Sequence, residues 1–188
     1  FLVLFLCANV FAADSVITWK MQSAFPPGVW IHNAGKILAD DINKMTAGRL
    51  KIEYYSAGEI VPAFEIHNAV NKGTLDAGFS WPGYVIGKYP AGTLFSSSPA
   101  FLDLLGYYTW VYAGGGKELW QEMYGNFLKV IPTSMMPTEG GGWSNKKIQK
   151  LSDFKGLKYR TVLIWGQILS DFGASVVTLR MGEVVPSL

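Results

Sequence analysis

Cysteine, histidine and charged residues are all scarce in this sequence. One Cys and two His among 188 residues cannot build a Cys/His zinc site. Only 16% of the residues are charged, and 16 Lys and Arg against 14 Asp and Glu leave a net charge of +2. This weak, dispersed charge argues against a nucleic-acid partner, which needs a concentrated basic face. Apolar residues make up 49% and aromatic residues 14% of the chain, enough for a sizeable core, and this excludes wholesale disorder.

Residues 1–13 form an apolar run that is too short to span a bilayer, which takes about 20 residues. The run has the length of a signal-peptide h-region, and Val10 and Ala12 suit the −3 and −1 positions of a cleavage site. We therefore expect residues 1–12 to be a signal-peptide remnant whose start is missing, and the protein to be exported. Loss of Cys7 with this segment leaves a mature chain without cysteine, which suits an oxidising compartment. The alternative is a buried N-terminal strand.

Strand and helix patterns alternate along the first part of the chain. The expected order is a strand at 16–21, a helix at 30–45, a strand at 50–55, a helix after Pro62 that Gly73 closes, and a strand at 76–81. This order predicts a parallel sheet with covering helices.

A second α/β pattern begins after Pro137. Before it we expect a loop at 92–99, helices at 104–113 and 118–124, and a long strand at 127–136; after it, strands at 142–144, 157–162 and 175–178, with a helix at 165–172. The sequence thus predicts a first α/β lobe over 13–136 and the incomplete start of a second over 137–188.

Enzyme motifs are mostly absent. Ser80 is not part of a G-x-S-x-G turn, and His32 and His67 are interpreted as solvated or core residues. Ser80 or Ser98 with His67 is the only candidate pair of nucleophile and base, and nothing in the sequence places them together. We expect a protein that is not an enzyme, with a periplasmic hydrolase or lyase as an alternative.

Three residues follow the ends of predicted strands, where open α/β sheets bind their ligands. Arg160 ends one strand and could grip a carboxylate through two parallel hydrogen bonds, or could be an ordinary surface arginine. Trp81 and Tyr84 follow the third strand and suit either a pocket wall or packing against the next helix.

Glycine and aromatic residues also gather in the segment 138–143. Three glycines there allow a close approach to a ligand, and the neighbouring Glu139 could ligate a cation or accept a hydrogen bond from a ligand hydroxyl. The alternative is a plain flexible turn with an exposed carboxylate.

Several segments together resemble a known family. They are DFKGLKYR at 153–160, Gly182-Glu183 about twenty residues later, GTLDAG at 73–78, and GGW at 141–143 followed by Lys147-Ile148. From about Ile17 to its last residue, the chain resembles the DctP-type substrate-binding proteins of TRAP transporters. The GGW segment narrows the resemblance to the branch that binds 2-oxo or 2-hydroxy acids, often with a metal ion.

This resemblance implies an α/β fold of the two-lobed periplasmic-binding-protein type (type II), here with a truncated second lobe. The implied function is an extracytoplasmic, periplasmic solute receptor that delivers a small organic acid to the small and large membrane subunits of a TRAP-type secondary transporter. It also implies that the full-length protein can form a homodimer through a late helix outside these residues. A ligand-sensing domain of a signalling protein is an alternative.

The resemblance also assigns roles to residues. Arg160 would pair with the substrate carboxylate and Trp143 would line the cleft. Phe64, Trp81 and Tyr84 would come from the first lobe. No cofactor is required, but Ca²⁺ or Na⁺ could bridge to the substrate. Glu139 stands where this branch often has a cation-ligating Gln, which means either a preference for a divalent ion or a direct contact with the substrate.

Overall fold

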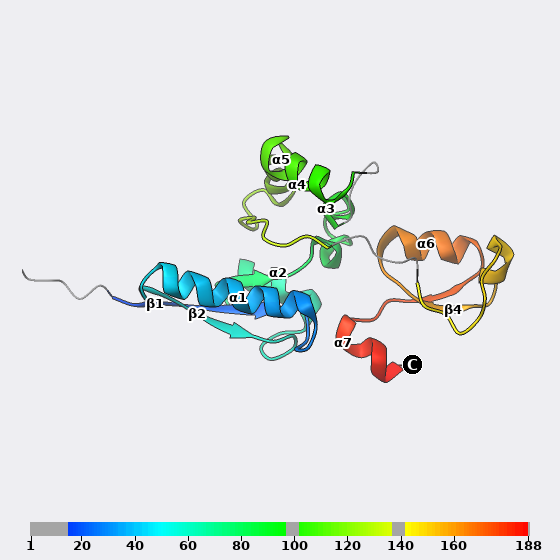
Figure 1. Cartoon of the computed structure of the whole chain (residues 1–188), viewed down its shortest axis with the longest axis horizontal. Helices are drawn as coiled ribbons and strands as arrows, with labels where there is room; N and C mark the ends of the chain where they lie inside the picture. Colours follow the sequence, from blue (N-terminus) through cyan, green and yellow to red (C-terminus); the bar gives the residue numbers. More distant parts are fainter. Residues whose placement is uncertain (1–14, 97–101, 137–141, 188) are drawn as a thin grey trace, which may run out of the picture.

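The computed structural model describes residues 15–96, 102–136 and 142–187, and Figure 1 shows the course of the chain. Two parallel sheets and a group of helices make up these residues. None of the helices in the described ranges has the length and apolar character needed to cross a lipid bilayer.

The first sheet contains three parallel strands in the order β2-β1-β3. They are β1 (Ile17–Ser23), β2 (Leu50–Tyr55) and β3 (Ala77–Phe79). β1 lies in the centre, and its Met21 pairs with Tyr54 on one side and with Ala77 on the other. The predicted parallel sheet is therefore confirmed.

Helix α1 (Trp30–Met45) makes the first crossover and runs along the sheet (Figure 1). Its apolar residues recur with helical spacing, so that one face packs on the strands and the other remains in solvent. Gly35 makes the close approach possible. A Cβ at this position would collide with the Tyr54 hydroxyl and lie 2.7 Å from Cδ1 of Phe79. The missing side chain therefore sets how closely the helix packs on the sheet.

The second crossover consists of the short helices η1 (Ala63–Glu65) and α2 (Ile66–Asn71). Ile66 and the following Leu75 are each only 1% exposed, so they anchor this connection in the core of the first sheet. Gly73 ends the helix in a left-handed conformation, with φ of 73°, as its sequence position predicts.

A group of helices follows the first sheet. These helices are η2 (Pro82–Val85), α3 (Gly92–Ser96), α4 (Leu104–Ala113) and α5 (Gly116–Tyr124). The ring of Phe95 stacks between Trp110 of α4 and Trp120 of α5, with centroid distances of 5.8 and 5.1 Å. This aromatic stack gives the helical group a centre of its own, separate from the sheet.

The second sheet pairs β4 (Lys158–Arg160) with β5 (Ser175–Val177) in parallel. The helix α6 (Leu163–Asp171) connects the two strands. The short helices η4 (Leu151–Phe154), α7 (Met181–Val184) and η5 (Val185–Ser187) flank this unit. The predicted strand-helix-strand order is confirmed here as well.

Three expected elements are wrong. Residues 127–136 form no strand, because the Gln121 side chain binds the Leu128 carbonyl at 2.8 Å and the Val130 N–H at 2.9 Å, and no described strand lies alongside. Residues 142–144 also form no strand. Residues 92–96 are the helix α3 instead of a loop, and 97–99 lie outside the described residues.

Candidate functional site

Arg160 is the last residue of β4, at the carboxyl ends of the two parallel strands of the second sheet. Its Nε and Nη2 atoms donate hydrogen bonds to the Leu179 carbonyl at 3.2 and 2.6 Å, which orient the guanidinium. The side chain is half-buried, and the ion pairs within the described part of the chain do not include it. Its positive charge is thus available to an anion.

An aromatic cluster lies at the carboxyl end of the first sheet. We use this name for Phe25, Phe64, Trp81 and Tyr84. Tyr84 is in its centre, with ring centroids 4.8 Å from Phe64, 5.4 Å from Trp81 and 6.3 Å from Phe25. The first two contacts are edge-to-face, an arrangement that aromatic pairs favour.

Local sequence explains how the cluster is placed. β3 ends at Phe79, and Pro82 then opens the turn of η2 that carries Tyr84. Phe64 belongs to η1, whose approach is held by the fully buried Gln22 of β1. The Gln22 amide donates to the Val61 carbonyl at 2.7 Å and accepts from the N–H groups of residues 60 and 61. The strand ends of the first sheet therefore position these rings.

Arg160 lies close enough to the aromatic cluster for its charge to act on Tyr84. Burial raises the pKa of the Tyr84 phenol, and the positive charge of Arg160 acts on the same pKa in the opposite direction. Met181, which follows β5, packs against the core of the first sheet. The structure thus brings three of the residues that the sequence predicts for the site, Phe64, Trp81 and Tyr84, into mutual contact around Tyr84, and the charge of the fourth, Arg160, acts on Tyr84.

Of the other two predicted residues, the structure places one elsewhere and does not describe the other. The Trp143 side chain is 100% exposed and makes none of the ring contacts found among the described residues. Glu139 lies outside the described residues. A pocket of about 320 Å³ next to Trp143 is lined by Tyr159 and Trp165, among others, but Arg160 is not part of its lining. Neighbouring residues of a strand point to opposite faces of the sheet, which explains why Tyr159 lines this pocket and Arg160 does not.

The described residues do not form a metal centre. Nowhere in the described ranges do three His, Cys, Asp or Glu side chains come close enough to hold a metal ion. The metal ligand predicted from the sequence, Glu139, falls in the part that the structure leaves undescribed.

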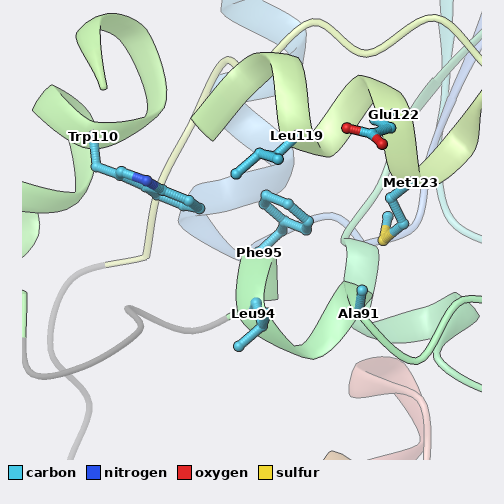
Figure 2. Close-up of a pocket in the computed structure, with 7 residues that line it drawn as sticks. All are labelled: Ala91, Leu94, Phe95, Trp110, Leu119, Glu122 and Met123. Carbon is cyan, nitrogen blue, oxygen red and sulfur yellow. The ribbon is translucent and has the colours of Figure 1, made fainter. Parts of the chain in front are cut away.

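A separate apolar pocket of about 430 Å³ lies in the helical group, between α3, α4 and α5 (Figure 2). Figure 2 shows Phe95, Trp110 and Met123 pointing into it. Glu122 is its one charged residue, so the lining offers no cation to an organic acid. This pocket therefore lacks the positive charge that Arg160 supplies at the end of β4.

The candidate nucleophile and base remain apart. The Ser80 hydroxyl is buried and has no hydrogen-bond partner within the described residues, and the same is true of the His67 Nδ1 atom. Burial lowers the pKa of His67 to about 4, so the ring is neutral at physiological pH. Ser98 lies outside the described residues. His67 fits the core residue that the sequence analysis expected.

Sequence reasoning missed two residues that shape the site. Gln22 lies in a strand that also carries Thr18 and Lys20, so no local pattern separates this buried residue from the exposed polar residues of the same strand. Arg180 follows β5 much as Arg160 ends β4, and its guanidinium carbon lies 5.3 Å from the centroid of the Phe64 ring. Equivalent positions on neighbouring parallel strands meet at one edge, and that rule could have revealed Arg180.

Comparisons with known proteins give a consistent result. Residues 21–188 match the family DctP, described as bacterial extracellular solute-binding protein, family 7. A monocarboxylate 2-oxoacid-binding periplasmic protein of Nostoc sp. is 35% identical over 173 residues, which cover 92% of this chain and 48% of that protein.

Solved structures agree with this match. A TRAP periplasmic solute-binding protein from Pseudoalteromonas atlantica, with bound sodium and pyruvate, has a TM-score of 0.85 and 30% identity over 93% of this chain and 54% of that one. One from Colwellia psychrerythraea, with bound calcium and pyruvate, has a TM-score of 0.85 and 29% identity over the same shares. The chain thus spans about half the length of these relatives.

Proposed function

Because this chain belongs to family 7 of the bacterial extracellular solute-binding proteins, as its motifs predicted, we propose that the full-length protein is the solute receptor of a TRAP-type transporter. It binds a small 2-oxo or 2-hydroxy carboxylate in a cleft between two α/β lobes, of which 13–136 is the first and 137–188 begins the second. The ligands of the relatives support this substrate class, since they are 2-oxoacids and pyruvate.

Arg160 is the observation that carries the proposal. It is half-buried at the carboxyl end of β4, is oriented by the Leu179 carbonyl and has no carboxylate partner among the described residues. Charges that leave water are normally paired, so a half-buried guanidinium without an acidic partner suits an incoming anion. The substrate carboxylate pairs with Arg160, and the aromatic cluster covers the apolar part of the substrate.

Binding then couples the two lobes. A ligand held by Arg160 on one side and by Phe64, Trp81 and Tyr84 on the other favours the closed arrangement over the open one. The closed form is recognised by the small and large membrane subunits. Trp143 completes the cleft upon closure. The protein acts in the periplasm after export through its signal peptide, and the full-length form can dimerise.

A cation belongs to the proposal through the relatives, two of which hold sodium or calcium together with pyruvate. Glu139 is its proposed ligand.

The test is the affinity of the full-length protein for pyruvate and 2-oxopentanoate, measured by isothermal titration calorimetry, for the wild type and for Arg160→Ala. A charge-assisted hydrogen bond contributes about 1.5–3 kcal/mol, so we expect a loss of about tenfold or more. Arg160→Lys retains the charge but not the two-pronged geometry and should bind with intermediate affinity.

Arg49→Ala is the matched control. Arg49 is exposed, and its side chain donates only to the nearby Thr46 carbonyl at 3.2 Å. It precedes β2, so it lies at the end of the first sheet that is opposite to the aromatic cluster. Its affinity should equal that of the wild type. A loss of less than about threefold in Arg160→Ala would contradict the assigned role. Absence of any carboxylate binding by the wild type would favour a sensor or an enzyme instead.

A further inference from the structure

Arg180 is a second guanidinium at the same site. It lies just after β5, and its guanidinium carbon is 5.3 Å from the centroid of the Phe64 ring. Phe64 contacts Tyr84 edge-to-face at 4.8 Å, and Tyr84 is the ring on which the charge of Arg160 acts. Arg160 in turn binds the carbonyl of Leu179, the residue before Arg180. Both arginines therefore converge on one aromatic pair.

The guanidinium of Arg180 is held in place but is not saturated. Its Nη1 atom donates to Oε1 of Glu183 at 2.7 Å, and its backbone N–H donates to Oε2 at 3.0 Å. Its Nε atom is shielded from solvent and has no hydrogen-bond partner among the described residues. A buried donor without a partner is unfavourable, so this N–H is a place where a ligand acceptor would be stabilising.

The balance of charge points in the same direction. Arg180 lies against Phe64, Arg160 binds the carbonyl of the residue before Arg180, and Glu183 is the one carboxylate that the described residues bring into contact with either guanidinium. A ligand with a single carboxylate, held by Arg160, leaves the Nε–H of Arg180 without an acceptor. A ligand with a second acceptor at its far end can satisfy both arginines.

We propose that Arg180 is a specificity-determining residue of the organic-acid site: it binds the second carboxylate of a 2-oxo or 2-hydroxy dicarboxylate whose first carboxylate pairs with Arg160. This inference rests on the proposed function. The guanidinium of Arg180 lies against the Phe64 ring, and its side chain is 40% exposed, so the ligand approaches the exposed part of the guanidinium. Glu183 holds the Arg180 guanidinium in place before the ligand arrives, so that little side-chain entropy is lost upon binding.

Two ligands that differ only in the distal group test this inference. 2-Oxopentanoate and 2-oxopentanedioate have the same number of carbon atoms, and only the second carries a distal carboxylate. We expect the full-length wild type to bind the dicarboxylate about tenfold or more tightly, as measured by calorimetry. Arg180→Gln should remove this preference, because it weakens binding of the dicarboxylate about tenfold or more and that of the monocarboxylate much less.

Arg49→Gln is the control, because it also removes one arginine charge, but at the end of the first sheet that is opposite to the aromatic cluster. This variant should retain the preference for the dicarboxylate. Thermal unfolding without ligand shows whether Arg180→Gln folds. If it does not, Arg180→Lys replaces it. In that variant the preference for the dicarboxylate should fall, while binding of the monocarboxylate persists. Equal losses for both ligands, or no preference in the wild type, overturn the inference. Binding of 2-oxopentanoate that still requires Arg160 would then leave the proposed function standing, whereas no binding of either ligand refutes both.

Discussion

Gln22 should be one of the most sensitive polar residues of the first sheet. Its side chain is 0% exposed, and its amide forms three hydrogen bonds to the backbone of residues 60 and 61, at 2.7, 2.9 and 3.1 Å. Gln22→Ala leaves two N–H groups and one carbonyl without these partners. At about 1 kcal/mol for each hydrogen bond, with a further contribution from the cavity, we expect a loss of about 3–5 kcal/mol in the free energy of unfolding.

The assay is chemical denaturation of the full-length protein, followed by tryptophan fluorescence. Gln167→Ala is the matched control, because Gln167 is exposed on α6 and its side-chain amide donates only to Asp171 at 3.1 Å. Its effect should remain within about 0.5 kcal/mol. A loss below about 1 kcal/mol for Gln22→Ala would show that residues 60 and 61 find other partners, and would refute the reasoning about this anchor.

Two further predictions concern the first sheet and its helices. Burial lowers the pKa of His67 from 6.5 to about 4, so the unfolded chain binds this proton at a higher pH than the folded protein does. The free energy of unfolding should therefore fall by about 3 kcal/mol in total as the pH drops from 6.5 to about 4. His67→Phe should flatten the pH dependence of the melting temperature in this range. Gly35→Ala should lower the free energy of unfolding by about 1–3 kcal/mol, because the new methyl group collides with Tyr54 and Phe79. An unchanged midpoint of chemical denaturation would show that α1 can move away from the sheet without a cost.

Regular periodicity made much of the fold predictable. The helix Trp30–Met45 and the strand Leu50–Tyr55 have the predicted bounds. Each of them buries one face in the core, and the regular spacing of its apolar residues reflects this burial. Residues 127–136 have strand-like composition but no strand to pair with, and composition alone does not supply a partner. Residues 92–96 are too short a helix to show a period.

The site was predictable where it follows from the ends of strands. Arg160 is the last residue of β4 and Tyr84 lies in the turn after β3, so the strand order predicts each of them at the carboxyl end of its own parallel sheet. Arg180 and Gln22 act through contacts with residues more than thirty positions away in the chain, with Phe64 and Val61 respectively. Such pairings depend on the three-dimensional arrangement, which local patterns do not contain.

The central place of β1 has a consequence for how the sheet assembles. β1 precedes β2 and β3 in the chain, yet both of them pair with it. Wherever the chain emerges from its N-terminal side, each new strand meets a partner that is already present, and the sheet grows outward in chain order. Its last strand ends at Phe79, so all the pairings of this sheet lie within the first 79 residues, and the sheet offers later segments a template on which to pack.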